Sequence, residues 1–268
     1  MRVVPLALAA IAAAAGTAAA NPRPLPFTYT TETLPPGAVE IEQFADLTPL
    51  RALSPATGGP VWYLGSQFQT EIEIGLLDRL ELGLYFTLVP QMNPERLSQT
   101  AQMTEGNGLK QRLRYTFATP GEWPIDVGVY GELTENEHEL EFEGKLLLQR
   151  RFGALRVAAN LWAEYEIEFG ASHDVVLDPT AGATYEISPK VSIGVDSWMR
   201  SESPSPAPAT RPFGLGPVVY VGPALMFQFG KLWWSFGAYG RVTDVDHTMQ
   251  PAEPFGPVWF RSMIGYEL

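Results

Sequence analysis

Hydrophobic and polar residues alternate with a period of two along most of this chain. In the last fourteen residues, Val258, Phe260 and Ile264 fall on one face of an extended segment, whereas Trp259 and Arg261 fall on the other. Because successive side chains of a β-strand point to opposite sides, this pattern predicts a strand with one apolar face. The sequence ends within this strand, as expected if the last strand closes a barrel against the first.

Twelve segments carry this alternation. Most are about 10 to 15 residues long, against the roughly 9 to 11 residues that a tilted transmembrane strand needs. Tight turns, such as Leu77-Asp78-Arg79, alternate with mostly long loops rich in Pro, Gly, Ser or Thr, such as 90–106. This asymmetry is typical of outer-membrane barrels, in which the short turns are periplasmic. The segments are 38–47, 60–75, 79–89, 107–118, 123–134, 137–152, 155–169, 173–188, 190–201, 214–230, 231–243 and 255–268.

Charged residues are confined to one face of these segments. In 79–89, Leu82, Leu84 and Phe86 alternate with Glu81 and Tyr85. A charge that faces lipid costs about 2–4 kcal/mol at the bilayer midplane, so we expect the charged face to line a lumen. A soluble β-sandwich or lipocalin-like barrel alternates in the same way with its apolar face inward. Strand length, the twelve up-and-down segments and the loop asymmetry favour the membrane, and we predict an all-β fold: a single transmembrane antiparallel up-and-down β-barrel of about 12 strands over 38–268.

The first 20 residues have the features of a secretory signal peptide. Arg2 supplies a positive charge, residues 3–15 are apolar, and Ala18-Ala19-Ala20 is a small-residue cleavage site. We therefore expect 1–20 to be removed and the protein to be exported to the outer membrane of a Gram-negative-type bacterium. Residues 21–37 hold five prolines and little alternation. They fit a periplasmic tail or a plug in the barrel mouth, and the sequence does not choose between the two.

Composition narrows the function classes. Acidic residues outnumber basic ones by 30 to 18, a formal net charge of −12, so nucleic acid is a poor partner. The chain has no cysteine, which excludes a disulfide framework and thiolate metal sites. We predict no metal and no cofactor. The partners we expect are outer-membrane lipid, the barrel-assembly machinery through the C-terminal strand, and a small-molecule solute.

Three stretches carry a family resemblance. They are Ile74-Gly75-Leu76-Leu77-Asp78-Arg79-Leu80-Glu81-Leu82, Leu109-Lys110-Gln111-Arg112-Leu113-Arg114-Tyr115, and Val221-Gly222-Pro223-Ala224 followed by Lys231-Leu232-Trp233-Trp234. With them the chain resembles the uncharacterised bacterial outer-membrane β-barrels grouped with the phenol meta-pathway transporter barrels. The resemblance covers most of the mature chain, but its motifs describe how a barrel is built rather than what it carries. It implies an outer-membrane channel for small hydrophobic or aromatic compounds and brings no catalytic residues.

The polar face supplies the candidate site residues. Rings of carboxylates bias a pore toward cations, whereas cross-strand ion pairs would brace a narrow barrel, and both interpretations remain open. Twelve strands lie between the eight of filled barrels and the 16 to 18 of open porins, so size does not decide. The lumen-facing acidic candidates are Glu71, Glu73, Glu81, Asp126, Glu132, Glu141, Glu143, Glu164, Glu166 and Glu186; the basic candidates are Lys110, Arg112, Arg114, Lys145, Arg156 and Arg200.

Aromatic residues near strand ends have two interpretations. Trp123 and Trp233 beside short turns, and Trp62 and Trp259 beside long loops, fit the interfacial girdles of a membrane barrel. Trp162 and Trp198 share the polar face instead, so they are the candidates for stacking on a ligand in the lumen.

An enzymatic function finds little support in the sequence. A rim hydrolase would need a serine, a histidine and an acid or amide on adjacent strands. The only suggestive clusters are His173-Asp174 and the 244–247 stretch, and no G-x-S-x-G is present. We predict a passive channel or transporter with an acidic lumen. A closed structural or surface-interaction barrel is the alternative, and an outer-membrane lipid-acting enzyme is the third.

Overall fold

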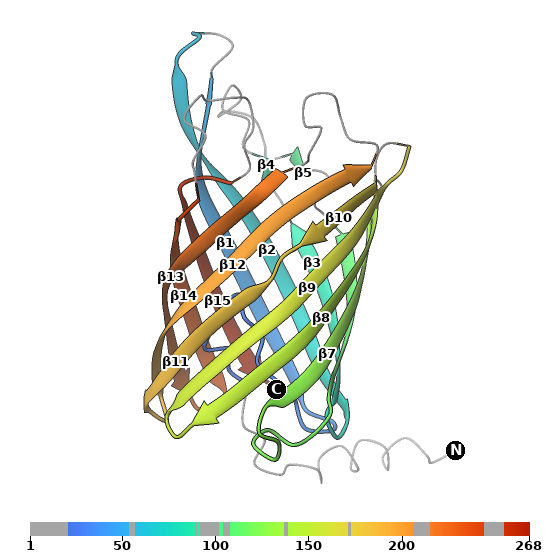
Figure 1. Ribbon diagram of the computed structural model, residues 1–268, viewed down its shortest axis with the longest axis vertical. Coiled ribbons are helices and arrows are strands. Elements are labelled where there is room, and N and C mark those ends of the chain that lie inside the picture. The colour runs from blue at the N-terminus through green and yellow to red at the C-terminus, as the bar shows by residue number, and fades with distance from the viewer. Residues whose placement is uncertain are drawn as a thin grey trace, which may run out of the picture.

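The protein is a closed antiparallel β-barrel in the computed structural model (Figure 1). The structure describes residues 21–53, 57–88, 90–91, 102–103, 108–136, 139–170, 173–205, 215–243 and 255–268. The strands of the wall are β1 Val39–Leu53, β2 Pro60–Leu77, β3 Leu80–Leu88, β6 Gly108–Thr116, β7 Asp126–Glu135, β8 Glu139–Phe152, β9 Leu155–Glu168, β10 His173–Leu177, β11 Thr180–Ser188, β12 Val191–Ser205, β13 Leu215–Phe229, β14 Leu232–Arg241 and β15 Val258–Glu267.

The predicted twelve-stranded barrel is confirmed, with one strand in two pieces. The segment expected at 173–188 forms β10 and β11, which are separated by Asp178 and Pro179 and both pair with β9 and β12. Proline has no N–H to donate, so the ladder is interrupted there. The first and last strands pair over eight residues, from Glu40 with Glu267 to Leu47 with Phe260, which closes the wall. A two-stranded hairpin, β4 Pro90–Gln91 with β5 Gln102–Met103, lies in a long loop.

The two ends of the barrel differ, as the connection lengths predict. Tight turns such as those at 153–154 and 189–190 lie at one end, together with the C-terminus; we call this end the turn rim (Figure 1). The strand ends that the longer connections join lie at the opposite end, the loop rim. Among the described residues, no helix is long and apolar enough to cross a membrane.

The wall has an apolar outside and a polar inside. Large apolar side chains such as Phe86, Leu113 and Leu161 are exposed on the outer surface, and Trp62 and Trp123 are exposed near its two ends, 57% and 47% respectively. The charged residues that alternate with the apolar ones are mostly buried. Because this burial lies inside the ring of strands, the polar core of the molecule is the lumen itself.

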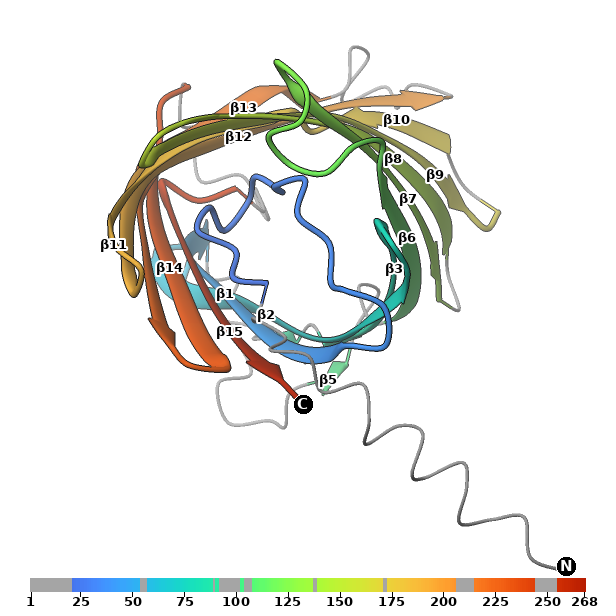
Figure 2. The same ribbon diagram turned by 90° about the horizontal axis from the view of Figure 1, so that it is seen from below.

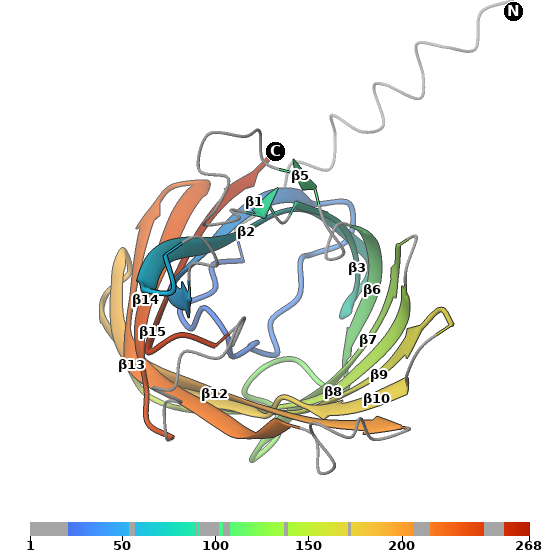
Figure 3. The same cartoon turned by 90° about the horizontal axis from the view of Figure 1, so that it is seen from above.

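Part of the lumen is filled by the chain that precedes β1. Residues 21–37, here called the inserted segment, form no strand and lie inside the barrel, as the views along its axis show (Figures 2 and 3). Leu25 and Leu34 are fully buried, and Phe27 and Tyr29 nearly so. Of the two placements that the sequence left open, the structure has the one inside the barrel.

Candidate functional site: a lumen divided by the inserted segment

The inserted segment is held by side chains of the wall. Its backbone has no strand ladder, so in a closed interior its polar groups must find other partners. Asn160 supplies both halves of one such contact: its Oδ1 accepts from the N–H of Tyr29 at 2.7 Å, and its Nδ2 donates to the Tyr29 carbonyl at 3.0 Å. Asp196 accepts from the Phe27 N–H at 2.8 Å and from the Thr28 hydroxyl at 2.6 Å. These contacts position the segment across the lumen.

Beside this segment, fully buried charges form a compact network that we call the Arg–Glu lattice. The Nη2 atom of Arg112 lies 2.8 Å from Glu71, 2.7 Å from Glu73 and 2.7 Å from Glu81. Arg114 also contacts Glu81 at 2.7 Å. The residues of the lattice are Arg23, Arg112, Arg114, Glu42, Glu71, Glu73 and Glu81.

The lattice includes Arg23 of the inserted segment, and it occupies space next to Gly83 of the wall that a larger residue would fill. Arg23 lies 3.3 Å from Glu42 and 3.9 Å from Glu71, with its guanidinium 3.8 Å from the centre of the Tyr29 ring. A Cβ at Gly83 would come within 2.5 Å of both Arg112 and Glu71, so a side chain there would displace the lattice. Burying charge is costly unless each ion has close partners, so the inserted segment and the wall depend on each other here.

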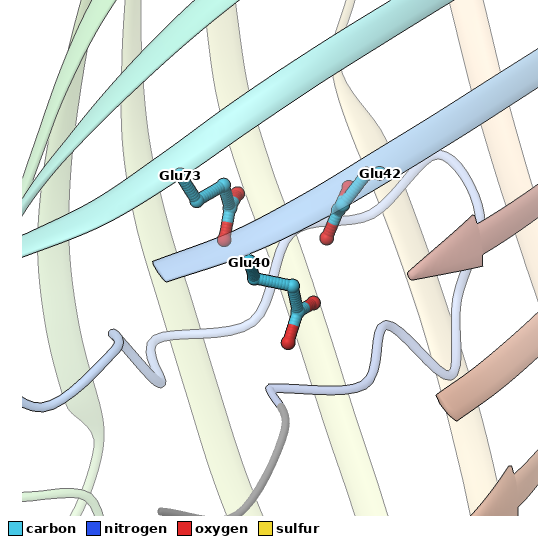
Figure 4. Close-up of side chains that lie close together, drawn as sticks. All are labelled: Glu40, Glu42 and Glu73. Atoms are coloured by element: carbon cyan, nitrogen blue, oxygen red, sulfur yellow. The ribbon is translucent and has the colours of Figure 1, made fainter. Parts of the chain in front are cut away.

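Three carboxylates gather where β1 and β2 meet the inserted segment. Figure 4 shows Glu40 and Glu42 on β1 and Glu73 on β2, and oxygen atoms of the three lie within 4.8 Å of one another. Glu40 accepts from the indole N–H of Trp233 at 2.7 Å and from the backbone N–H of Asn21 at 3.1 Å. One oxygen of Glu42 and one of Glu73 have no hydrogen-bond partner among the described residues.

On the loop-rim side of the inserted segment lies a cavity of about 510 Å³, which we call the vestibule. One side of it is charged. Arg200 contacts four carboxylates at 2.6–3.1 Å. Lys110 lies 3.0 Å from Glu132, and Lys145 lies 2.7 Å from Glu143. The carboxylates that line the vestibule are Glu132, Glu139, Glu141, Glu143, Glu164, Glu166, Asp178 and Glu202.

Another side of the vestibule is aromatic. Trp198 stacks on Tyr220 with ring centres 4.6 Å apart and on Phe27 at 5.0 Å, and Trp259 meets it edge-on at 5.1 Å. Arg261 lies 3.8 Å from the centre of the Phe27 ring. The indole N–H of Trp198 has no hydrogen-bond partner among the described residues, although the side chain is only 6% exposed.

Two other cavities lie on the turn-rim side of the inserted segment. They measure about 360 and 530 Å³, and both are lined by Glu32 and Thr33. Neither shares a lining residue with the vestibule, whose floor includes Arg23, Phe27 and Tyr29 of the inserted segment. The inserted segment therefore lies between the vestibule and these two cavities, and contributes to the lining of all three.

The structure distributes the predicted site residues over three places. Glu71, Glu73, Glu81, Arg112 and Arg114 belong to the lattice, where no side chain is more than about 1% exposed. Asp126, Arg156 and Glu186 lie toward the turn rim: Asp126 accepts from the Gly121 N–H, Arg156 contacts Glu32 at 3.1 Å, and Glu186 is exposed. The residues that line the vestibule are Glu132, Glu141, Glu143, Glu164, Glu166, Lys110, Lys145, Arg200, Trp162 and Trp198.

Two tryptophans assigned to an interfacial girdle lie inside the barrel instead. Trp233 is fully buried beside Glu40, and Trp259 donates to Asp46 at 2.9 Å and lines the vestibule. Proximity to a rim suggested the girdle. Successive side chains of a strand point to opposite faces, however, so an even or odd position along the strand decides whether a residue faces lipid or lumen. Trp234, one residue after Trp233, is the one exposed on the outside.

Several residues of the interior were not singled out from the sequence. Glu40, Glu42 and Asp46 repeat every second residue along β1, a signal that the alternation already contained. Asn160 and Asp196 share the polar face of their strands with Trp162 and Trp198, but nothing in the alternation indicates their role, which depends on a segment more than 130 residues away in the chain.

The histidine clusters do not form a catalytic arrangement in the described residues. His173 is exposed and stacks beside Tyr165 at 6.1 Å. His138 and the 244–247 stretch lie outside the described residues.

No family model matches this chain, and no curated protein matches it. Solved structures do. An outer-membrane channel from Pseudomonas putida F1 is similar with a TM-score of 0.60 and 13% identity, over 89% of this chain and 98% of that one. The NanC porin matches with a TM-score of 0.55 and 7% identity, over 86% and 100%. The KdgM porin, solved in complex with oligogalacturonate, matches with 0.53 and 10%, over 85% and 99%. The chain thus has the fold of outer-membrane barrel channels.

Proposed function

We propose that this protein is an outer-membrane channel for small solutes that is closed by its own inserted segment in the conformation described here. The observation that carries the proposal is the division of the lumen: a vestibule faces the loop rim, two cavities lie toward the turn rim, and residues 21–37 lie between them. With the turn rim periplasmic, a solute would enter the vestibule from outside and pass when the segment moves.

The way in which the segment is held is compatible with such movement. No strand ladder fixes it, and its contacts run mainly to side chains such as Asn160, Asp196 and Glu81. The neutral hydrogen bonds to Asn160 contribute about 0.5–1.5 kcal/mol each. Movement of the segment must also release the stronger contacts to Asp196 and Glu81 and the ion pair of Arg23 with Glu42, but it breaks no hydrogen bond between strands of the wall. The fold of the three similar channels supports this function, and the resemblance to the phenol meta-pathway transporter barrels suggests that the solutes are aromatic. The aromatic side of the vestibule fits that class.

We propose that selectivity for cations resides in one part of the lumen and not along the whole acidic face that the sequence predicts. Glu71, Glu73 and Glu81 are neutralised by Arg112 and Arg114, so they supply little field to a solute. The vestibule has the larger excess of carboxylates over cations and surrounds a cavity, so it is the part of the lumen that would favour cations.

A reversible lock tests the channel and its closure together. Since the chain has no cysteine, Thr31→Cys with Thr116→Cys introduces a single pair, at a point where the Thr116 hydroxyl donates to the Thr31 carbonyl at 2.6 Å. We expect the oxidised protein in planar bilayers to show no conductance above leak and the reduced protein to conduct. Each single variant should behave as the wild type under both conditions.

The outcomes separate the alternatives. Equal conductance in the oxidised and reduced forms would show that the segment does not close the channel. The absence of conductance in every form, in samples whose gel mobility changes on boiling as a folded barrel's does, would favour the closed structural barrel. Recovery of the wild type as a soluble protein without detergent would refute the membrane location.

A further inference from the structure

We infer that the vestibule is a binding site for phenolic alkylamines: small organic cations that join an ammonium group to an aromatic ring bearing an oxygen. This inference deepens the proposed function, because it names the solute class that the vestibule would select. It has three parts, which are the charge of one side, the aromatic surface of the other, and an indole N–H that lacks an acceptor.

The charged side of the vestibule has more carboxylates than its cations engage. Eight carboxylates line the cavity, against Lys110, Lys145 and Arg200 on the same side. Two further cations in the lining, Arg23 and Arg261, are paired with carboxylates that lie outside it. A cation from outside would therefore lower the electrostatic energy of the cavity, whereas an anion would raise it.

One carboxylate oxygen of the cavity lining has no hydrogen-bond donor among the described residues. Asp178 lies in the break between β10 and β11 and is 6% exposed. Its Oδ2 is 2.9 Å from Arg200, but its Oδ1 has no hydrogen-bond partner among the described residues. Leaving a buried carboxylate oxygen without a donor costs free energy, and an ammonium group with three donors would supply one.

The aromatic side selects the rest of the molecule. Trp198, Trp259 and Phe27 line the cavity, and its volume of about 510 Å³ lies within the usual range of ligand pockets, roughly 300–1,000 Å³. The unpaired indole N–H of Trp198 needs an acceptor, which a phenolic oxygen provides. Lys145, 3.5 Å from the Trp162 ring centre, already shows the pairing of a cation with an aromatic ring in this cavity.

Isothermal titration of the detergent-folded protein with four related probes tests the site. Tyramine carries both the cation and the phenol, phenethylamine only the cation, tyrosol only the phenol, and 4-hydroxyphenylacetate an anion with the phenol. We expect tyramine to bind about tenfold more tightly than tyrosol, with phenethylamine between them and the anion weakest. Raising the ionic strength should weaken the binding of tyramine and leave that of tyrosol nearly unchanged.

Two variants locate the binding. Asp178→Asn should weaken tyramine about fivefold and leave tyrosol unchanged, whereas Glu186→Gln, exposed at the turn rim, should change neither. If Asp178→Asn does not fold, Glu166→Gln on the same side serves instead. Tyrosol or the anion binding as tightly as tyramine would overturn the inference, as would no binding of any probe. Binding without conductance would instead count against the channel function, because the titration does not depend on passage.

A second inference rests on a different observation, the contact between Asn21 and Glu40. We infer that removal of the leader after Ala20 completes the carboxylate cluster of Figure 4. Hydrolysis of the peptide bond by a leader peptidase, with water as the co-reactant, would leave an ammonium group at Asn21. The N atom of Asn21 lies 3.1 Å from Glu40 Oε2. The new charge would therefore form an ion pair at a cluster in which one oxygen of Glu42 and one of Glu73 have no hydrogen-bond partner among the described residues.

Shifting the cleaved terminus tests this role. Inserting Gly-Ser between Ala20 and Asn21 leaves export intact but moves the ammonium about 7 Å along the chain. We expect the extended protein to unfold at a lower temperature than the wild type on heated gels, and the difference to disappear when both carry Glu40→Gln. Equal unfolding temperatures in the Glu40 background would overturn the inference, and so would an equal difference in the Glu40→Gln background.

Discussion

The two halves of the lumen are built on the same strands, but their charged side chains are paired to different extents. Toward the turn rim, the inserted segment brings Arg23 and a row of backbone groups, and Glu42, Glu71, Glu73 and Glu81 find cations at short distances. Toward the loop rim no segment of the described chain fills the space, and the carboxylates exceed the cations around a cavity. The same alternation of polar residues therefore makes a brace in one half and lines a cavity in the other. The difference is made by what occupies the lumen.

The largest expected effect concerns the wall that both halves share. Leu146→Arg on β8 would place a charge on the outer surface, where Leu146 is 36% exposed, at a cost of about 2–4 kcal/mol in lipid. The amount of folded barrel in membrane fractions should fall sharply. Glu143→Gln, on the inner face of the same strand, is the matched control and should assemble well. If both variants assembled equally, our assignment of the faces would be wrong.

The next prediction compares the two halves directly. Arg112→Ala leaves three fully buried carboxylates without their shared partner and should cost about 3–5 kcal/mol, seen as a lower unfolding temperature on heated gels. Lys110→Ala in the vestibule removes a cation that is 19% exposed beside a cavity, where water can replace part of its pairing with Glu132, so we expect a smaller loss of about 1–3 kcal/mol. Similar losses in the two variants would mean that the halves do not differ in the way described.

A smaller effect is expected from loosening the inserted segment. Asn160→Ala removes both hydrogen bonds to the backbone of Tyr29 and should weaken the closed conformation by about 1–3 kcal/mol. Openings in planar bilayers should become more frequent while the wall stays folded. Gln69→Ala, which also changes the lumen but lines only the vestibule, is the control. An opening frequency in Asn160→Ala that matches the control would count against closure by the segment.

The smallest effect is on ion preference. Replacing Glu141, Glu164 and Glu166 together by Gln should lower the cation-to-anion permeability ratio by about twofold, measured from reversal potentials in a salt gradient. Glu186→Gln at the turn rim should leave the ratio unchanged. Since Glu73 is neutralised in the lattice, Glu73→Gln should alter stability more than selectivity. A ratio that responds to Glu73→Gln but not to the vestibule variant would reverse the roles of the two halves.

Much of the barrel could be predicted because a wall between lipid and a polar lumen imposes a period of two on every strand. The twelve segments, the tight turns of one rim and the closing strand follow from that constraint. The girdle assignment of Trp233 and Trp259 failed because it used distance from the rim instead of parity along the strand. The break at Asp178 and Pro179 was overlooked, although a proline inside a strand pattern is a signal for it.

The candidate site was less predictable. The alternation predicted which charged residues face inward. It left open whether they form ion pairs with one another or produce a net electrostatic field in the lumen. Arg112 pairs with Glu71, Glu73 and Glu81, whereas Lys110, two residues away on the same face, reaches Glu132 and the vestibule. Register between strands sets these partners, and no local pattern encodes register across a closed sheet.

The sequence by itself determined the architecture: an apolar surface for lipid, a polar interior, and strands that leave no unpaired edge in the membrane. Only the tertiary structure decided what the interior does. Residues 21–37 have no periodic pattern, and their position follows from partners as distant in the chain as Asn160 and Asp196. Whether the carboxylates brace the barrel or surround a cavity depends on that position, because a charge is neutralised by what lies a few ångströms away in space, whatever its neighbours in sequence.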